Sequence, residues 1–403
     1  MRKFKSIAAL AASIVTAAVT MLSCFGSATA NEIDINATVP PFENIKYKDP
    51  DNNGYLSPSD SLPIQAYLLG LKTPYDDRLT HFDINDNGII SYFDSWLISA
   101  YFAGGFDGPS SSYANYIDLN SANSSTAYWR HNCSSSNSHS YTSYSLSERN
   151  WNPYTYTTFP TYIDPSDMMK EDNGETAVVR LSDSDSPEVC CTGTIVGDHV
   201  IATAAHCVYS NEKGFFKDLK IDIIEDGITP IETFNASYVH IPQEYTINQE
   251  PKFDYALIYV EDDLSDYGKF ELGIAMDSFT AASTGSEKVK VSGFPFNEKY
   301  MPAGAEKGQR YVAEGIVMES NDTDNFIHHN AHVTNGHSGS PIYIEETFSK
   351  NGLSYKGKTL IAIHTTGGLY IDPSGNLVSL FGYGTRITQK HALFYLSNPY
   401  ITG

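Results

Sequence analysis

The sequence predicts an all-β domain over residues 151–403, preceded by a small α-helical module over residues 45–105. Two observations lead to this prediction. Short runs of β-branched and other apolar residues recur between Gly, Asn and Asp turns after Trp151, which is typical of a β-barrel or a β-sandwich. Upstream, an acidic loop pattern occurs twice with an offset of 34 residues, and a short helical pattern follows each copy.

Residues 1–30 have the composition of a signal peptide rather than of a folded element. Three cations stand at its start: Arg2, Lys3 and Lys5. An apolar stretch follows over residues 7–25, and Ala28-Thr29-Ala30 is a small-residue cleavage site. The mature chain would then begin at Asn31, with residues 31–44 as a leader, and would be secreted. An uncleaved membrane anchor is the alternative.

The chain is strongly acidic, with 48 Asp and Glu residues against 26 Lys and Arg residues and a formal net charge of -22. Loss of the three signal-peptide cations changes the charge from -22 to -25. Such a surface repels nucleic acid and anionic lipid, so we expect neither as a partner. No later stretch is long and apolar enough to span a bilayer, which predicts no membrane association after cleavage.

The repeated loops have the spacing of calcium ligands. Calcium takes about six to eight oxygen atoms, which a tight loop offers from positions 1, 3, 5, 7 and 12, with glycine at position 6. In the first copy the ligand positions hold Asp49, Asp51, Asn53, Tyr55 and Asp60. In the second copy they hold Asp83, Asn85, Asn87, Ile89 and Asp94. The sequence therefore predicts two Ca²⁺ sites, of which the second is weaker because it offers fewer carboxylates.

A short helix is predicted after each loop, because the match between the copies continues beyond the loops. Ile64 corresponds to Ile98, and Gly70 corresponds to Gly104, where each helix would end. The alternative is a pair of Asp and Asn turns that bind no cation. Two aligned copies make this alternative less favoured than a single loop would.

Aspartate, rather than glutamate, stands at position 12 of both loops. With the duplication and the short helices, this resembles dockerin modules, which bind cohesins on the scaffold proteins of cellulosome-type complexes. The resemblance implies a cohesin partner, contacted through Pro58 and Ser59 in the first copy or through Tyr92 and Phe93 in the second. It also implies that the secreted protein is attached to an extracellular scaffold complex.

Residues 106–150 predict a linker between the module and the β-rich domain. Ser, Asn, Gly and Tyr dominate this segment, and aliphatic residues are scarce. This composition is typical of a flexible connection.

Nine short runs predict the strands of the all-β domain. Each run is rich in Val, Ile, Leu, Tyr or Ala and is bounded by turn residues. They cover residues 177–181, 194–196, 200–203, 221–224, 256–260, 289–292, 311–317, 342–344 and 360–364.

Three segments of this domain carry the residue types needed for acyl transfer. They contain His206 before Cys207, Asp254 after Phe253, and Ser338 within Gly336-His337-Ser338-Gly339-Ser340-Pro341. Acyl transfer at neutral pH needs a nucleophile, a base that takes its proton, and a group that orients the base. Each residue alone has a structural explanation, as a packed histidine, a surface acid or a turn serine. The three together favour catalysis.

The order His, Asp, Ser and the residues around each resemble the chymotrypsin-like serine endopeptidases. The resemblance implies a two-barrel protease domain in which Ser338 is the nucleophile, His206 the base and Asp254 the orienting acid. It implies an oxyanion hole made by the backbone N–H groups of Gly336 and Ser338. The expected substrate is a protein or peptide, and no cofactor is expected for catalysis.

The same resemblance bears on the four cysteines that remain after signal cleavage. Cys191 and Cys207 match the disulfide beside the catalytic histidine of that family, which leaves Cys133 and Cys190 to pair with each other. An exported protein with an even number of cysteines favours disulfides. Four free thiols are the alternative.

The serine motif and a histidine at position 364 further resemble the bacterial glutamyl endopeptidases. In that group the histidine receives the carboxylate of a P1 glutamate, and an imidazole can pair with such an anion. The resemblance implies four substrate-binding residues: His364, Thr334, Thr366 and Gly367. Val333 departs from the group, which carries a hydroxyl at that position.

Two other functions compete with a glutamyl endopeptidase. One is a protease of another specificity, in which His364 is a core residue. The other is a catalytically silent binding protein that keeps the protease fold. Many relatives need a new N-terminus, so a processing site between the linker and Glu175 is compatible with a zymogen.

Overall fold

We describe the protein from a computed structural model. It describes residues 48–50, 55–56, 58–70, 79–102, 117–118, 168–171, 174–183, 186–216, 218–280, 287–296, 301–318, 325–350, 353–371, 377–388, 391 and 394. The predicted signal peptide, leader, Asp51, Asn53 and Cys133 lie outside these residues, as does most of the predicted linker. Among the described residues, no helix is long and apolar enough to cross a membrane.

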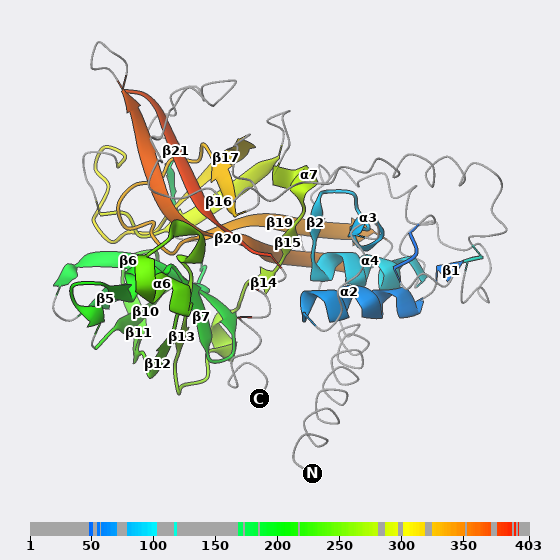
Figure 1. Cartoon of the computed structure of the whole chain (residues 1–403), viewed down its shortest axis with the longest axis horizontal. Helices are drawn as coiled ribbons and strands as arrows, with labels where there is room; N and C mark the ends of the chain where they lie inside the picture. The colour runs from blue at the N-terminus through cyan, green and yellow to red at the C-terminus, as the bar shows by residue number, and fades with distance from the viewer. Residues whose placement is uncertain are drawn as a thin grey trace.

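Seven antiparallel strands form the first sheet of the β-rich part, in the order β11-β10-β5-β6-β7-β13-β12 (Figure 1). They are β5 (Val178–Asp183), β6 (Ser186–Gly197), β7 (Val200–Thr203), β10 (Lys220–Ile224), β11 (Pro230–Asn235), β12 (Tyr238–His240) and β13 (Ala256–Tyr259). Within the described residues its end strands are not paired with each other, so this sheet is curled but open.

Eight strands form the second sheet, and six of them close on themselves. They are β4 (Met168–Lys170), β14 (Glu271–Leu272), β16 (Lys288–Gly293), β17 (Tyr311–Met318), β18 (Phe326–His329), β19 (Pro341–Lys350), β20 (Leu353–Ile371) and β21 (Leu377–Arg386). The pairings run β16-β17-β18-β21-β20-β19 and return to β16. The second sheet thus has the closure expected of a barrel, and all nine predicted runs coincide with strands.

Short elements connect the strands. They are η7 (Ala205–Cys207), β8 (Tyr209–Ser210), β9 (Gly214–Phe215), α6 (Gln243–Asn248), η8 (Pro251–Phe253), η9 (Ser265–Tyr267), β15 (Ile274–Ala275) and α7 (Asp277–Thr280). Two of them, η7 and η8, lie at the candidate active site described below.

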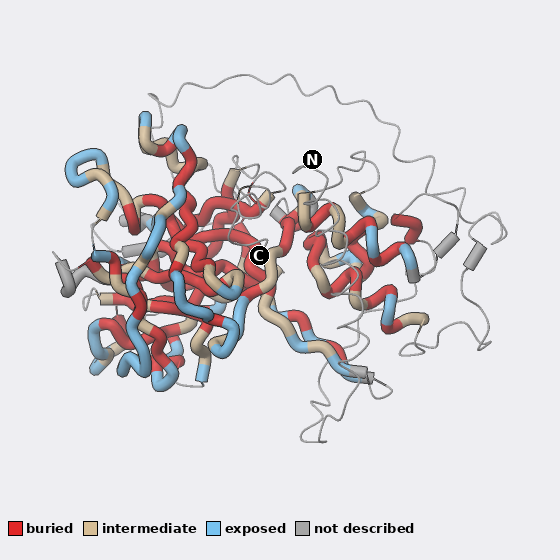
Figure 2. Tube along the Cα trace, turned by 90° about the horizontal axis from the view of Figure 1, so that it is seen from below, coloured by how far each residue is buried: buried red, intermediate tan, exposed pale blue. Residues whose placement is uncertain are grey.

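Each sheet encloses an apolar core, because alternate side chains of a strand point to the same face. Val178, Ile201 and Leu257 are fully buried in the first sheet, and Val291 and Ile361 are fully buried in the second. Full burial of one such side chain contributes about 1.5–3 kcal/mol. Figure 2 shows the buried chain in the interior of the β-rich part, with exposed loops around it.

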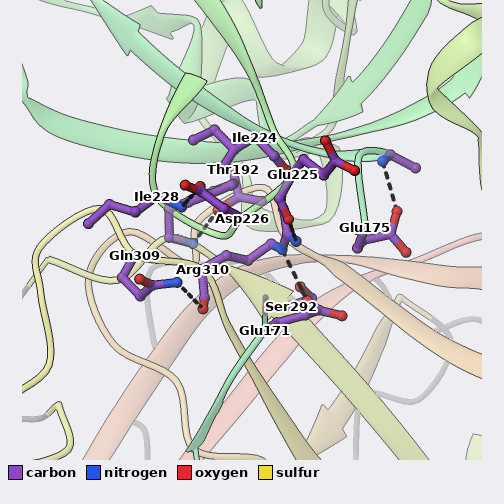
Figure 3. Close-up of polar contacts among 12 residues, drawn as sticks. Glu171, Glu175, Thr192, Ile224, Glu225, Asp226, Ile228, Ser292, Gln309 and Arg310 are labelled. Carbon is purple, nitrogen blue, oxygen red and sulfur yellow. Dashed lines mark hydrogen bonds and ion pairs between the residues drawn. The ribbon is translucent and has the colours of Figure 1, made fainter. Parts of the chain in front are cut away.

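The two sheets are joined through the buried side chain of Arg310, which lies just before β17 (Figure 3). Its Nη1 donates to the carbonyl oxygen of Ile224 in the first sheet at 2.6 Å. Its Nε lies 3.3 Å from the carboxylate of Glu171, which also accepts a hydrogen bond from Ser292 of β16. Glu171 directly follows β4, so this cluster ties the start of the β-rich part to both sheets.

The described N-terminal part contains short helices. It contains η2 (Pro58–Asp60), α2 (Ser61–Leu68), α3 (Leu79–Phe82), α4 (Tyr92–Phe102) and the short strands β1 (Tyr55–Leu56) and β2 (Ile89–Ile90). We call residues 48–102 the repeat module and residues 83–94 the second loop. A helix follows each loop, and Gly70 beyond α2 has a left-handed φ of 68°. The helix α3 was not predicted, and β1 pairs with β3 (Ile117–Asp118), which lies in the predicted linker.

The repeat module packs directly against the β-rich part. Strand β2 pairs with β15, and β19 and β20 extend to helix α4 (Figure 1). Phe93 of α4 is 3% exposed and lies against Tyr355 of β20, with ring centroids 4.7 Å apart. The expectation that Phe93 offers a face to a cohesin is therefore wrong, because the protein's own β-hairpin covers that side chain.

Candidate active site

His206 and Asp254 meet at one end of two paired strands. His206 lies in η7 directly after β7, and Asp254 ends η8 directly before β13. Thr203 of β7 is opposite Ala256 of β13, so the two loops leave the sheet side by side. His206 Nδ1 is 2.7 Å from one carboxylate oxygen of Asp254, and the backbone N–H of His206 donates to the other at 2.9 Å.

The carboxylate of Asp254 sets the electrostatics of this pair. Burial alone would lower the pKa of His206, but the charge of Asp254 and its hydrogen bond raise that pKa to about 9. Because Nδ1 faces the carboxylate, the neutral ring carries its proton there and leaves Nε2 free to accept one. The pair therefore has the arrangement of a base with an orienting acid.

Ser338 lies in a tight loop between β18 and β19, at the contact between the two sheets. Gly336 and Gly339 on either side of it have left-handed φ values of 104° and 82°. A Cβ at Gly336 would stand 2.1 Å from the carbonyl oxygen of Phe294, and one at Gly339 would stand 2.2 Å from Oγ1 of Thr203. Only glycine fits these positions, and Gly339 brings the serine loop against the strand that leads to His206.

Thr192 of β6 holds the serine loop from the first sheet, and the sequence did not point to it. Its N–H donates to the carbonyl oxygen of Ser338 at 2.8 Å, and its hydroxyl donates to the carbonyl oxygen of Gly336 at 2.8 Å. The hydroxyl also accepts from the N–H of Phe294 at 3.1 Å. Its position directly after Cys191 is the only sequence signal that could have drawn attention to it.

The two N–H groups expected in the oxyanion hole come from this fixed loop. Within the described residues, neither the N–H of Gly336 nor that of Ser338 has a hydrogen-bond acceptor. Their carbonyl oxygens, by contrast, both accept from Thr192. These bonds hold the two residues in the loop, and their N–H groups remain available to a developing negative charge.

His364 lies on β20 beside the serine loop. Its N–H donates to the carbonyl oxygen of Ser340, and its own carbonyl oxygen accepts from the N–H of Gly339, both at 2.8 Å. The residue is 3% exposed, and its Nδ1 is 3.4 Å from Nε2 of His329. Burial, followed by the nearby His329, holds the pKa of His364 well below its ordinary value, so the ring is neutral.

The other predicted substrate-binding residues differ in how exposed they are. Thr366 and Gly367 are exposed on β20, which is paired with β21. Thr334 is half-buried, and its carbonyl oxygen accepts from the N–H of His337 at 3.0 Å. Val333 is buried, and its apolar side chain offers no hydroxyl to a substrate carboxylate. His329 was not predicted, and its spacing from the serine motif gives no signal for its contact with His364.

The cysteine predictions are tested only in part by their positions. The thiols of Cys191 and Cys207 lie close enough to influence each other's pKa, and the charge of His206 also acts on Cys191. Both are free thiols in this structure, so their disulfide stays a prediction. Cys190 of β6 lies opposite Ser182 of β5. Cys133 lies outside the described residues.

The second loop folds around two buried carboxylates. Asp83 accepts hydrogen bonds from the N–H groups of Asn87 and Gly88, and Asp94 accepts from those of Ile84 and Ser91. Burial raises the pKa of Asp83 to about 6, and burial with the charge of Asp83 raises that of Asp94. A divalent cation would offset this concentration of buried negative charge, so the donor set fits Ca²⁺.

The remaining calcium predictions are less fully described. Asn85 and Asn87 each turn an amide oxygen back to the loop, and Ile89 forms part of β2. In the first loop, Asp49 and Asp60 are buried, and Tyr55 starts β1. No three His, Cys, Asp or Glu side chains converge as a metal site in the described part of the chain. The second loop offers two carboxylates and otherwise neutral oxygens.

Comparisons with known proteins agree with the geometry. Residues 191–347 match the family model of the trypsin-like peptidase domain. The chain is 26% identical over 217 residues to the glutamyl endopeptidase of Bacillus licheniformis, covering 53% of this chain and 60% of that protein. It is 25% identical over 200 residues to a Bacillus subtilis protein named extracellular metalloprotease, covering 49% and 55%. The chain spans little more than half the length of these relatives.

Solved structures of proteases are similar at a lower level. A Glu endopeptidase matches with a TM-score of 0.44 and 18% identity, over 59% of this chain and 97% of that one. The protease Anisep of Arthrobacter nicotinovorans matches with a TM-score of 0.43 and 14% identity, over 59% and 100%. The family match covers His206, Asp254 and Ser338. Residues 191–347, which hold the contact between His206 and Asp254 and the serine loop, are thus similar to a trypsin-like peptidase domain.

Proposed function

We propose that the protein is a serine endopeptidase that acts through Ser338, His206 and Asp254. The observation that carries this proposal is the 2.7 Å contact between His206 Nδ1 and Asp254, next to the glycine-flanked loop of Ser338. The alternative of a catalytically silent binding protein has less support. His206 and Asp254 are in contact, and Thr192 fixes the loop that carries Ser338.

The geometry supports an acyl-enzyme mechanism. The hydroxyl oxygen of Ser338 attacks the carbonyl carbon of the substrate, while His206 Nε2 takes the hydroxyl proton. The carbonyl oxygen becomes an oxyanion near the N–H groups of Gly336 and Ser338. When the carbon–nitrogen bond breaks, His206 returns the proton to the leaving amine. Water then attacks the ester by the same steps and releases the acid.

A serine-reactive phosphonate tests this function. We expect one equivalent to attach to Ser338 in the wild-type chain, with loss of peptidase activity. Ser338→Ala should not be labelled, whereas Ser340→Ala serves as a matched control two residues away that retains the nucleophile. Absence of labelling in a folded wild-type protein would refute the protease function and favour the binding protein.

We further propose a preference for glutamate at P1, with His364 as the residue that binds its carboxylate. The neutral ring of His364 can donate one hydrogen bond, and an entering carboxylate would raise its pKa and favour the imidazolium. The name of the Bacillus licheniformis relative agrees with this chemistry. Thr366 and Gly367 are exposed beside it on β20 and can offer backbone groups to the substrate.

A peptide series with Glu, Asp, Gln or Leu at P1 tests the preference. We expect kcat/KM to be highest for Glu, and His364→Gln to reduce the ratio of Glu to Gln cleavage while the phosphonate still labels Ser338. Faster cleavage after Leu would contradict the role of His364 without affecting the proposed triad.

For the repeat module, we propose binding of Ca²⁺ and docking to a cohesin-bearing scaffold outside the cell. The buried carboxylates of the second loop support the cation, and the residues of the first copy remain as the partner face because Phe93 is covered. Calcium titration of the full chain by calorimetry tests the cation. Pro58→Asp with Ser59→Asp should abolish cohesin binding, whereas unchanged affinity would reject this face.

The proposed secretion has its own test. The signal-peptide composition of residues 1–30 supports export, and one matched relative is named as extracellular. We expect N-terminal sequencing of protein collected from culture medium to begin at Asn31. Retention of all the protein in the cell fraction would contradict export.

A further inference from the structure

The second loop is part of the contact between the repeat module and the protease domain. Ile89 and Ile90 of β2 pair with Ala275 and Ile274 of β15. The N–H of Met276 donates to the carbonyl oxygen of Gly88 at 2.8 Å. Residues on the second loop therefore make backbone hydrogen bonds to the protease domain.

Gly88, at the turn position of the second loop, lies against a protease side chain. A Cβ at Gly88 would stand 3.0 Å from Cβ of Phe279 and 3.2 Å from its backbone nitrogen. Gly88 also has a left-handed φ of 80°, which the loop needs to bring its ligands together. The conformation that forms the cation loop is thus the conformation that fits against α7.

An aromatic cluster extends the contact along α4. Phe93 and Trp96 project from α4 toward the hairpin of β19 and β20. Trp96 lies 5.3 Å from Phe348 and 5.4 Å from Tyr355, measured between ring centroids. Phe348 and Tyr355 are opposite each other across the hairpin, so one face of the hairpin packs against the repeat module.

Glu346 connects the protease domain to the ligand positions of the second loop. This buried residue of β19 accepts a hydrogen bond from the hydroxyl of Ser91 at 2.9 Å and lies 3.5 Å from the amide nitrogen of Asn87. On the protease side it also accepts from Thr359 at 2.5 Å. Asn87 and Ser91 occupy positions 5 and 9 of the loop, so Glu346 contacts the loop where its oxygens are arranged.

We propose that the second loop couples cation binding to the protease domain: Ca²⁺ in this loop stabilises its contact with β15, α7 and the β19–β20 hairpin. This inference rests on the proposed Ca²⁺ site. The cation fixes Gly88, Asn87 and Ser91 in the arrangement that these protease elements also contact. Coupling of this kind is reciprocal, so the docked protease domain raises the affinity of the second loop for Ca²⁺ by the same factor.

The experiment uses the full chain carrying Ser338→Ala, which prevents self-digestion, and Asp51→Ala, which disables the first loop. Calorimetry with CaCl₂ measures binding to the second loop. Hydrogen–deuterium exchange measures protection of the peptides that contain Met276 and residues 346–358, with and without CaCl₂. We expect calcium to slow exchange in both by about fivefold or more, the lower end of typical coupling.

Two hairpin variants test reciprocity against a matched control. Phe348→Ala removes an aromatic ring from the contact, and Glu346→Gln removes its charge while keeping an oxygen for Ser91. We expect each variant to lower the calorimetric affinity for Ca²⁺. The factor should equal the factor by which the calcium-dependent slowing of hydrogen exchange in the Met276 peptide decreases. Glu345→Gln removes an equal charge from the exposed face of the same hairpin and should change neither quantity.

The outcomes separate the inference from the calcium site on which it rests. Binding of calcium with protection confined to residues 83–102 would overturn the coupling and leave the site intact. Absence of binding by calorimetry would overturn both. If Phe348→Ala does not fold, Glu346→Gln alone decides, because it preserves the shape of the contact.

Discussion

At the scale of single residues, Thr192 is the side chain on which the serine loop depends most directly. It is the only described residue that bonds to the carbonyl oxygens of both Gly336 and Ser338. Because these oxygens belong to the loop that carries the N–H groups of the proposed oxyanion hole, Thr192 would act as a positioning residue in the proposed mechanism. It reaches them from the first sheet, so the proposed nucleophile is held by the sheet that also carries the proposed base.

We predict that Thr192→Val lowers kcat by about tenfold or more with little change in KM. The valine keeps the shape but removes the hydrogen bonds of the Thr192 hydroxyl to the N–H of Phe294 and the carbonyl oxygen of Gly336, at a cost of about 1–3 kcal/mol. Steady-state kinetics check this. Thr194→Val is the matched control, since the buried hydroxyl of Thr194 has no partner in the described residues. A rise in KM alone would count against the positioning role.

A second residue-scale prediction concerns Asp254 and pH. The carboxylate raises the pKa of His206, so imidazolium persists to higher pH, and activity, which needs the neutral ring, declines as pH falls through that raised value. Asp254→Asn should lower kcat about 10⁴-fold, as in other Ser-His-Asp triads. Without the carboxylate the pKa of His206 falls, so the acid limb of the residual kcat/KM profile should shift to lower pH. Profiles of kcat/KM against pH check this, with Asp263→Asn as an exposed-acid control; an unshifted acid limb would contradict it.

The residues that the sequence predicted are those to which the proposed mechanism assigns a chemical role. His206, Asp254 and Ser338 stand in motifs with their own local flanks, and the structure brings His206 to Asp254 and the serine loop to the same edge. Thr192 and His329 could not be found in this way. Their roles depend on contacts across 144 and 35 residues of chain, and no local pattern records such contacts.

At the scale of elements, β4 and Glu171 directly after it show how the two sheets are joined. Strand β4 pairs with β17, and Glu171 places its carboxylate beside the guanidinium of Arg310. Both side chains are buried. A buried charge that loses its partner is strongly destabilising, whereas an exposed ion pair contributes little.

We predict that Glu171→Gln lowers the free energy of unfolding by about 3–5 kcal/mol, the usual cost of an unpaired buried charge. Denaturant unfolding in the Ser338→Ala background checks this. The double variant Glu171→Gln with Arg310→Met should recover part of the loss, because no guanidinium then stays uncompensated. Glu314→Gln, in the exposed pair with Lys288, should change stability by less than about 1 kcal/mol.

Elements were predictable where their side chains follow a regular period. The nine apolar runs became strands because each must bury one or both faces, and the helices after the loops followed from the repeat. The helix α3 and the strand β15 were missed, since each has only a few residues and too short a pattern. The pairing of β2 with β15 joins residues more than 180 positions apart, so only the folded chain reveals it.

At the scale of the whole molecule, the net charge of -22 makes self-repulsion a general cost of the compact state. Salt screens this repulsion, because the Debye length falls from about 10 Å at 0.1 M to about 3 Å at 1 M. We predict that raising NaCl over this range in EDTA increases the midpoint of thermal unfolding by at least about 2 °C. A scan of the Ser338→Ala protein checks this, and a lower midpoint in salt would contradict it.

The arrangement of the β-rich part also sets a limit on how the chain can be shortened. A proteolytic cut after Glu171 would separate β4 from the chain that follows, and its loss would expose the edge of β17 and leave the guanidinium of Arg310 without its counter-charge. We therefore expect a cut that preserves the proposed activity to lie upstream of Met168. A fragment that keeps the two sheets joined would therefore begin at or before Met168, inside the domain that the sequence predicts from residue 151.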